Sequence, residues 1–363
     1  MEHRFGRRAL LRGAGGLAAA AVLPSLAACG TGTSRATTGG GSKTVIVRNS
    51  GGAYGEALQK GIYTPFSKET GIEVKVVNLS GTQSLAQMKQ GRPQFDLMDN
   101  SMSQFSRWIP ENVLEPLDYD RISSFKSAKL PENMVKEYAV GKSYYATVMA
   151  YSTEAFGNKA PGTWADFWDA GGFAGNRSMG NPDADIPELE FALLADGVPM
   201  DKLYPLDVDR AFKAMDRIRP HIKKYWDTGN LPGVLLSRRE VALSTVWHGR
   251  LDQLIAGGAP LAYQLSGGRR QAQGYAIPKG AANLDAAYQL IDFTLRPEVQ
   301  AGIAKFYPAN PAVAAAYDRL TAEERANLPG SPEFFDKGFD VDIDWWLKNE
   351  SAISKRWREW ARD

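Results

Sequence analysis

The chain has 363 residues, with 43 Lys and Arg against 41 Asp and Glu, and a single cysteine. This length exceeds what one hydrophobic core usually covers, so we expect two domains. The nearly neutral charge argues against nucleic acid as a partner, which requires a concentrated basic surface. One cysteine excludes an intramolecular disulfide.

Residues 1–28 are typical of an export signal. Four arginines precede a weakly apolar run at residues 13–28. The run has roughly 16 residues, fewer than the roughly 20 that a membrane-spanning helix needs. Residues 6–12, G-R-R-A-L-L-R, resemble a twin-arginine signal, although Gly6 and Leu10 depart from the usual Ser/Thr and Phe. Removing residues 1–28, which contain four Arg and one Glu, changes the formal net charge from +2 to −1.

A lipid anchor is expected directly after this signal. Residues 26–29, L-A-A-C, resemble a bacterial lipobox, in which Cys29 is lipidated and becomes the mature N-terminus. The alternative is a signal cut at an A-x-A-like site. The Gly/Ser/Thr-rich residues 29–42 are typical of a flexible tether. We therefore expect an exported protein in the periplasm or at the outer face of the cytoplasmic membrane.

The body begins with alternating strand and helix patterns. Strands are predicted at residues 44–48, 72–77 and 95–98, and helices at 54–69 and 83–90. This order predicts a parallel sheet with right-handed crossovers.

Polar residues follow two of these strands. Gly52 and Tyr54 come after the first strand, and Asn100 and Ser101 come after the third. Because ligands of open α/β sheets bind beyond the carboxyl ends of the strands, we expect both loops to line one crevice. For the first loop, an ordinary strand-to-helix turn is an equally good explanation.

The middle of the chain offers further candidates. Residues 142–152 predict a long strand that passes between domains, and its Tyr144 and Tyr145 are better explained as strand aromatics than as ligands of ferric iron. Thr163 and Asp166 predict a capping box at a helix start. The loop at residues 180–188 clusters carboxylates, which either suit the dipole of the following helix or bind ligand: Asp183, Asp185 and Glu188.

Residues 241–249, V-A-L-S-T-V-W-H-G, predict a buried strand that ends in an aromatic, an imidazole and a glycine. At the carboxyl end of this strand, Trp247 and His248 are expected to line the ligand pocket. The alternative is a core tryptophan beside a hydrogen-bonded histidine.

The remaining elements are mostly helical. Helices are predicted at residues 207–217, 232–237, from about 250, 284–295 and from 297, with a strand at 271–278. The tail, residues 342–363, places six apolar residues on one helical face, which we expect to pack on the body rather than on a membrane surface: Ile343, Trp346, Leu347, Ile353, Trp357 and Trp360.

The order and spacing of several short motifs carry a resemblance over residues 43–318. They include F-S-K-E-T-G-I-E-V (66–74), M-A-Y-S-T-E-A-F (149–156), P-G-T-W-A-D-F-W (161–168), V-W-H-G (246–249), A-I-P-K-G (276–280) and Y-P-A-N (307–310). The chain resembles the extracellular solute-binding proteins of ATP-binding-cassette (ABC) importers, close to the spermidine/putrescine branch.

This resemblance implies an α/β, two-lobed periplasmic-binding-protein fold of type II-like form. Each lobe is a parallel-rich sheet flanked by helices, and the ligand binds in the cleft between lobes that close by hinge motion. The expected lobes are residues 43–148 plus about 270–318, and residues 149–269 plus about 319–363. We expect a monomer that delivers its small-molecule ligand to a membrane permease and uses no cofactor.

The resemblance also bears on the ligand. Tyr54, the loop after F-D-L-M and Trp247 match cleft positions of the polyamine binders, but the tryptophan and aspartate that precede A-I-P are Gln271 and Gln273 here. A polyamine would need Asp183 or Asp185 in place of that aspartate. The competing ligand is an amino-acid derivative, opine or small carboxylate bound by Arg48, Gln271, Gln273 and backbone N–H groups.

Two other classes of protein fit the sequence less well. An exported hydrolase needs a nucleophile with a base, or a metal, whereas beyond residue 28 the only histidines are His221 and His248 and the only cysteine is Cys29. We therefore expect no enzyme, no catalytic residues and no metal site. The same fold could also present its ligand to a membrane sensor or bind ferric iron.

Overall fold

The computed structural model describes residues 43–182, 184–326 and 328–362, and these residues belong to one compact unit. Its strands form one sheet in the order β2-β1-β3-β9-β5-β8-β6-β7, with β4 and β10 paired to β5 and β11 paired to β9. Their bounds are β1 Thr44–Asn49, β2 Glu73–Asn78, β3 Leu97–Ser101, β4 Val135–Lys136, β5 Ala139–Ser152, β6 Arg177–Gly180, β7 Ile222–Trp226, β8 Leu243–Trp247, β9 Leu261–Ala276, β10 Asn310–Pro311 and β11 Phe339–Asp340.

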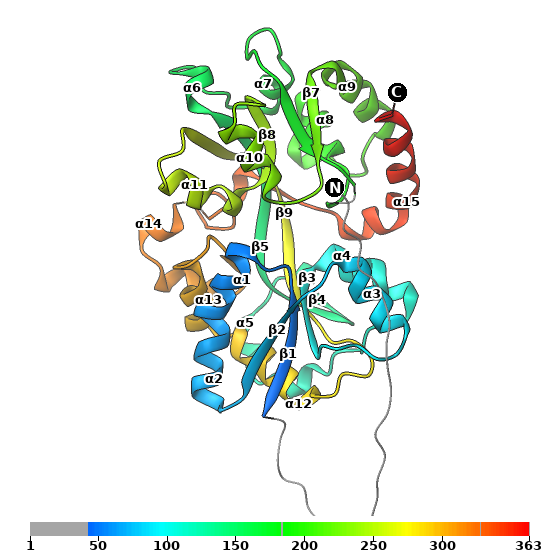
Figure 1. The fold of residues 1–363 in the computed structure, drawn as a ribbon, viewed down its shortest axis with the longest axis vertical. Helices are drawn as coiled ribbons and strands as arrows, with labels where there is room; N and C mark the ends of the chain where they lie inside the picture. The colour runs from blue at the N-terminus through cyan, green and yellow to red at the C-terminus, as the bar shows by residue number, and fades with distance from the viewer. Residues whose placement is uncertain (1–42, 183, 327, 363) are drawn as a thin grey trace, which may run out of the picture. The chain divides into compact units, whose positions relative to one another are not determined.

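Two groups of parallel strands define two lobes. In the first lobe β1 is parallel to both β2 and β3, which confirms the predicted β-α-β-α-β order. In the second lobe β6 is parallel to both β7 and β8. The long antiparallel strands β5 and β9 pair with each other and extend through both lobes (Figure 1). The carboxyl ends of the parallel strands therefore lie towards the middle of the unit.

The helices flank this sheet. In the first lobe they are α1 Gly52–Leu58, a π-helical segment Gln59–Tyr63, α2 Thr64–Thr70, α3 Gly81–Lys89, α4 Met102–Trp108, α5 Phe125–Ala128, α12 Leu284–Thr294 and α13 Pro297–Ala304. In the second lobe they are α6 Thr153–Phe156, α7 Trp164–Trp168, α8 Leu189–Ala195, α9 Val208–Ile218, α10 Leu231–Ser237, α11 Asp252–Ala256 and α15 Ile343–Trp360, and α14 Ala322–Arg325 lies in the connection that precedes α15. The capping box of Thr163 and Asp166 is present at α7, as predicted.

Two strands differ from their predicted bounds. The sequence predicts a strand at residues 95–98, but β3 continues through Ser101 because Asp99, Asn100 and Ser101 pair with β9. The strand predicted at residues 271–278 is the end of the 16-residue β9. Both differences result from pairing between distant segments, which local patterns do not reveal.

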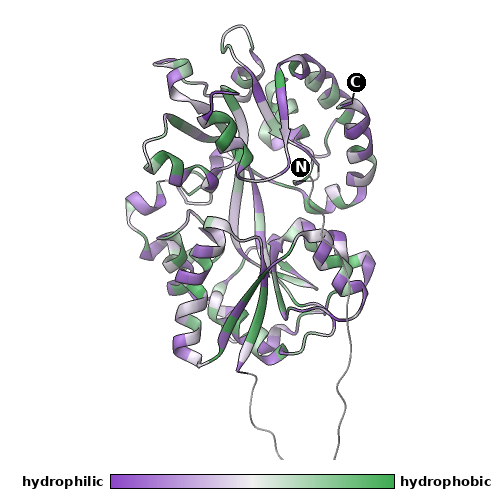
Figure 2. Cartoon of the chain, viewed as in Figure 1, coloured by the Kyte–Doolittle hydropathy of each residue, from purple (hydrophilic) through white to green (hydrophobic). Residues whose placement is uncertain are grey.

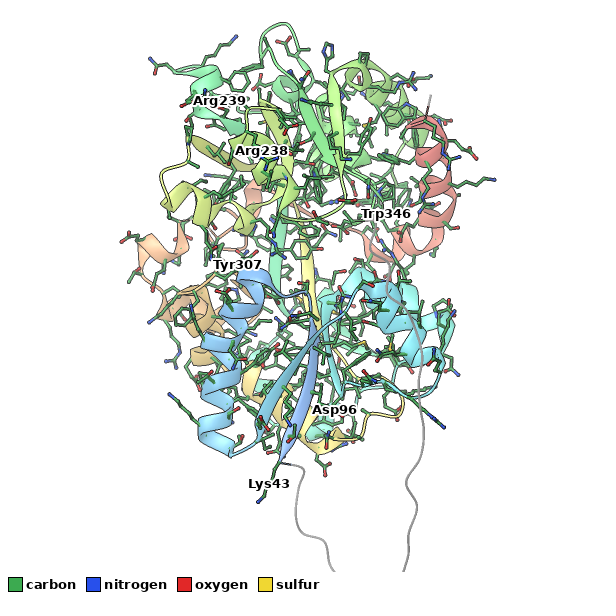
Figure 3. All side chains as sticks on the ribbon, viewed as in Figure 1. Lys43, Asp96, Arg238, Arg239, Tyr307 and Trp346 are labelled. Carbon is green, nitrogen blue, oxygen red and sulfur yellow. The ribbon has the colours of Figure 1, made fainter. Side chains whose placement is uncertain are left out.

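The tail packs on the second lobe. Trp346, Ile353 and Trp357 of α15 are buried in a core shared with α7, α8 and α9 (Figure 3 labels Trp346), which confirms the predicted packing. Leu347, however, is 41% exposed, so its predicted place on the buried face is wrong. It follows Trp346 by one residue, which rotates it about 100° around the helix. Accordingly, α15 shows both hydrophobic and hydrophilic colours in Figure 2.

Candidate functional site

A cavity lies where the carboxyl ends of the parallel strands meet, and it encloses about 800 Å³ of non-protein space, part of it open to solvent. Loops of both lobes and the two long strands contribute to it. Its lining residues are Ser50, Tyr54, Asn100, Ser101, Gln104, Arg107, Ser143, Tyr144, Tyr145, Ala184, Asp185, Trp247, Arg250, Gln273, Tyr307 and Ala309.

Six of the residues predicted for the site line this cavity: Tyr54, Asn100, Ser101, Asp185, Trp247 and Gln273. Asp183 and Cys29 lie outside the described residues. Gly52, His248, Gln271 and Arg48 do not line the cavity.

His248 was expected in the pocket but lies behind it. The residue is 1% exposed, and its Nδ1 and Nε2 atoms lie 3.3 and 3.1 Å from the carbonyl oxygens of Ala146 and Pro308. A 3₁₀ turn at His248–Arg250 follows β8 directly and turns the chain, so Trp247 faces the cavity while the imidazole is enclosed. Burial lowers the pKa of His248, which favours a neutral structural histidine.

The other three residues support the site from outside. Gln271 donates from Nε2 to Asp185 Oδ1 at 3.0 Å. Arg48 donates to the carbonyl oxygens of Leu79 and Asp99, so it fastens the loop after β2 to strand β3. Gly52 has φ +64°, and a Cβ there would lie 3.2 Å from Arg250 Nη1.

A buried polar network underlies the wall of the first lobe. Tyr54 donates from its hydroxyl to both carboxylate oxygens of Asp99 at 3.1 Å, and Gln273 Nε2 donates to Asp99 Oδ1 at 2.6 Å. Lys142 Nζ donates to the Tyr54 hydroxyl at 2.6 Å and lies 3.2 Å from Asp99 Oδ2. Burial raises the pKa of Tyr54 well above its usual value, so its hydroxyl stays protonated.

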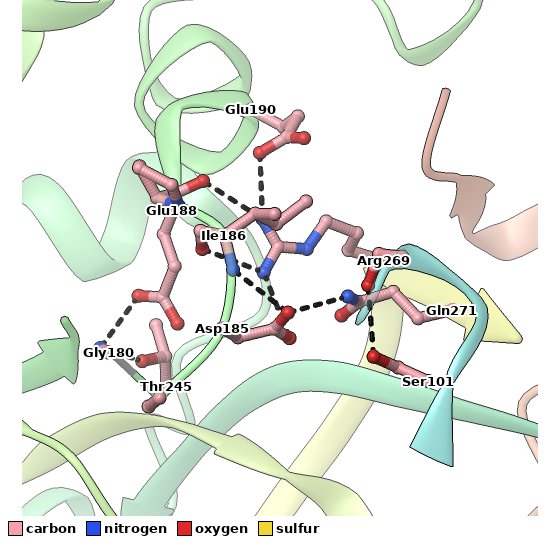
Figure 4. A network of polar contacts seen from close by, with 12 residues as sticks. Ser101, Gly180, Asp185, Ile186, Glu188, Glu190, Thr245, Arg269 and Gln271 are labelled. Carbon is pink, nitrogen blue, oxygen red and sulfur yellow. Dashed lines mark hydrogen bonds and ion pairs between the residues drawn. The ribbon is translucent and has the colours of Figure 1, made fainter. Parts of the chain in front are cut away.

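The wall of the second lobe contains a carboxylate with a free oxygen. Asp185 Oδ1 accepts hydrogen bonds from Ile186 N at 2.8 Å and from Gln271, whereas its Oδ2 has no hydrogen-bond partner. Arg269 lies behind it, 3.8 Å from Asp185 Oδ2 and 3.0 Å from Glu190 Oε2 (Figure 4). Asp185 can therefore accept a further hydrogen bond from a ligand.

Glu188 is a third carboxylate in this cluster, and it is 3% exposed. It accepts a hydrogen bond from Gly180 N at 3.1 Å. Desolvation by burial raises the pKa of Glu188 to about 7, against an opposing effect of Arg269. The second lobe therefore holds Asp185 and Glu190 beside Arg269, with Glu188 only partly ionised at about pH 7.

Aromatic rings complete the cavity. The Trp247 ring meets Trp226 and Tyr145 edge to face, with centroid distances of 5.5 and 6.1 Å. Tyr307 packs edge to face on Tyr54 at 5.4 Å. Trp247 Nε1 is buried without a hydrogen-bond partner, so it can donate to a ligand.

Two arginines were missed by the sequence analysis. Arg107 on α4 pairs with Glu350 on α15, with Nε donating to Oε2 at 2.7 Å and Nη2 lying 2.6 Å from Oε1. Arg250 forms no hydrogen bond or ion pair with the described residues, and its guanidinium carbon lies 6.0 Å from the Trp247 ring centroid. The signal that could have revealed Arg250 is its position three residues after Trp247, at the same strand end.

Other site types find no support in the described part of the chain. Among these residues no group of three or more His, Cys, Asp or Glu side chains is arranged to hold a metal ion. None of the helices described has both the length and the apolar character that crossing a membrane requires.

A family model described as "Bacterial extracellular solute-binding protein" matches residues 61–329, which is more than half of the chain. The chain belongs to this family. The solute-binding protein is 28% identical to the gamma-aminobutyric acid-binding protein of Pseudomonas aeruginosa, covering 88% of this chain and 91% of that one. It is 26% identical to the spermidine/putrescine-binding periplasmic protein of Salmonella typhimurium, covering 75% and 79%.

Solved structures agree with this assignment. A substrate-binding protein of an ABC transporter from Bradyrhizobium japonicum matches the solute-binding protein with a TM-score of 0.82 and 32% identity, covering 87% of this chain and 99% of that one. MotA of A. tumefaciens, solved in complex with glucopine, matches with a TM-score of 0.79 and 28% identity, covering 88% and 99%. These matches confirm the predicted family and two-lobed fold.

Proposed function

We propose that this ABC substrate-binding protein captures a small solute that carries both an amine and a carboxylate, of the ω-amino-acid or opine type. The observation that carries the proposal is a pair of oppositely charged groups that line one cavity and can each accept a further partner. Arg250 has no ion pair among the described residues, and Asp185 Oδ2 has no hydrogen-bond partner. A guanidinium binds a carboxylate, and a carboxylate binds an ammonium group, each through charge-assisted hydrogen bonds.

A polyamine fits this cavity less well. Its second ammonium group would enter a cavity that is lined by Arg250, which has no ion pair among the described residues, and like charges at short range disfavour binding. Gln273, where polyamine binders have an aspartate, is neutral. Relatives named for gamma-aminobutyric acid and for polyamines both exist, so family membership alone does not decide between the ligands.

The aromatic residues would enclose the apolar part of the ligand. From the second lobe, Trp247 contributes its ring and an Nε1 donor without a hydrogen-bond partner. From the first lobe, Tyr54 and Tyr307 contribute two further rings. Closure of the lobes around the ligand would use residues 43–148 plus about 270–318 as one body and residues 149–269 plus about 319–363 as the other. Strands β5 and β9, which connect the lobes, are the natural hinges.

The finer features of the cellular role belong to the same proposal. Cys29 would hold the protein to the outer face of the membrane by a lipid, and a monomer would dock on the permease. The protein would have no catalytic activity, because His248 is enclosed and serves as a structural residue.

Thermal unfolding with a panel of solutes tests the proposal. The panel contains ω-amino acids, opines, α-amino acids, dicarboxylates, putrescine and spermidine. A ligand present at 100 times its Kd adds about 2.7 kcal/mol to the free energy of unfolding, which raises the Tm by several degrees. We expect shifts with solutes that carry both charges. Shifts confined to polyamines would overturn the proposal.

A further inference from the structure

A buried ion pair lies directly behind two residues of the cavity wall. The side chains of Lys142 and Asp99 are 2% and 0% exposed, and their Nζ and Oδ2 atoms are 3.2 Å apart. Neither residue lines the cavity, but both contact Tyr54, and Asp99 also contacts Gln273. The pair therefore adjoins the ligand space without touching it.

The directions of the hydrogen bonds fix what the wall offers to a ligand. An ionised carboxylate only accepts hydrogen bonds, so the Tyr54 hydroxyl proton and the Gln273 amide nitrogen must both point at Asp99. Lys142 in turn donates to the Tyr54 oxygen. The Gln273 oxygen Oε1 is consequently directed away from Asp99, as a neutral acceptor.

Lys142 also determines the charge of this wall. Without the ammonium group, the wall of the first lobe would carry the full negative charge of Asp99, separated from the cavity only by Tyr54 and Gln273. A negative charge in a poorly solvated site attracts cations strongly. With Lys142 in place the pair is neutral, so the described residues of this lobe that line the cavity provide no anionic partner for a second ammonium group.

We propose that Lys142 is a specificity-determining residue, which neutralises Asp99 and so makes the cavity select a ligand with one amine over a diamine. This inference rests on the proposed function and deepens it. A merely structural ion pair would contribute to folding, but its loss would weaken all ligands alike.

The ionisation of Lys142 agrees with this role. Burial lowers the pKa of Lys142, and the Asp99 carboxylate opposes that effect both through its charge and through a hydrogen bond. The lysine therefore depends on Asp99 for its charge, and each residue compensates the other. Replacing Lys142 alone therefore leaves the negative charge of Asp99 without a partner behind the wall.

Isothermal titration calorimetry with putrescine and 4-aminobutanoate tests the proposal. In Lys142→Met, Asp99 becomes uncompensated, and we expect putrescine to bind at least tenfold more tightly than to the wild type. In Lys142→Arg the positive charge is retained, so putrescine binding should stay within threefold of the wild type. The double variant Lys142→Met/Asp99→Asn is neutral again and should also return to that level.

A second variant guards against a folding failure of Lys142→Met, which thermal unfolding would reveal. Lys142→Gln leaves the same carboxylate uncompensated and should strengthen putrescine binding relative to 4-aminobutanoate, whereas Asp99→Asn removes that carboxylate and should not. Equal weakening of both solutes in every folded variant would overturn the inference. A wild-type protein that prefers putrescine would instead overturn the proposed function.

Discussion

Replacing Arg250 by Met probes the group that we assign to the ligand carboxylate. The side chain lines the cavity, is half-buried and has no ion pair with the described residues. A hydrogen bond that involves a charged group contributes about 1.5–3 kcal/mol, so its loss should raise the Kd of a carboxylate ligand roughly 10- to 150-fold. Because no protein partner loses an ion pair, the free energy of unfolding should change little.

Isothermal titration calorimetry with the best solute of the thermal panel measures this effect. Arg250→Lys should recover part of the affinity, since an ammonium group retains the charge without the two-pronged geometry. Arg238→Met is the matched control, because Arg238 is an exposed arginine of the second lobe outside the cavity (Figure 3). An Arg250→Met variant that binds as tightly as Arg238→Met would refute the assignment.

Three further perturbations follow from the structure. Trp247→Ala removes a cavity wall and should weaken binding more than tenfold in calorimetry while the circular dichroism spectrum stays unchanged; full affinity would argue against this wall. Gly229→Ala puts a Cβ about 2.5 Å from the Trp247 ring, which must then shift, so the affinity for the ligand should fall severalfold in calorimetry. In the control Gly162→Ala the new Cβ meets no atom closer than 3.9 Å, and the affinity should not change. The pKa of Glu188 is raised from 4.5 to about 7 in the folded state. Because the folded state therefore holds this proton more tightly than the unfolded state, the protein loses stability as the pH rises from about 4.5 through about 7. In urea unfolding, the free energy of unfolding of the wild type should fall by about 3 kcal/mol more than that of Glu188→Gln between about pH 4.5 and about pH 8. An equal fall in both proteins would disprove the raised pKa. As a control, Glu359→Gln, at an exposed position, should behave as the wild type.

The sequence allowed prediction of the residues that follow parallel strands. Tyr54, Asn100 and Trp247 each lie at or just after the carboxyl end of a strand with a clear apolar pattern. Since such ends meet at one edge of a parallel sheet, Tyr54 and Asn100 could be assigned to one crevice from order alone, whereas the resemblance to the family placed Trp247 in the same cleft. The same rule placed His248 wrongly, because it cannot resolve a turn that begins one residue after the strand.

The charged residues of the site were harder to predict. Arg107 lies on α4 and Arg250 at the end of a 3₁₀ turn, and neither position has a local pattern that distinguishes it from a surface arginine. Lys142 did carry a signal, since it is a lone lysine among otherwise buried residues of β5 and therefore requires a carboxylate partner. That partner, Asp99, is 43 residues away, and only the paired sheet brings the two together.

The central claim is that the ligand carries one positive and one negative group, and three solutes of equal chain length test it most directly. Isothermal titration calorimetry compares 4-aminobutanoate, 1,4-diaminobutane and butanedioate, which share a four-carbon chain and differ only in their end groups. We predict that 4-aminobutanoate binds at least tenfold more tightly than either 1,4-diaminobutane or butanedioate. Binding of the diamine or the dicarboxylate with equal or higher affinity would contradict the account.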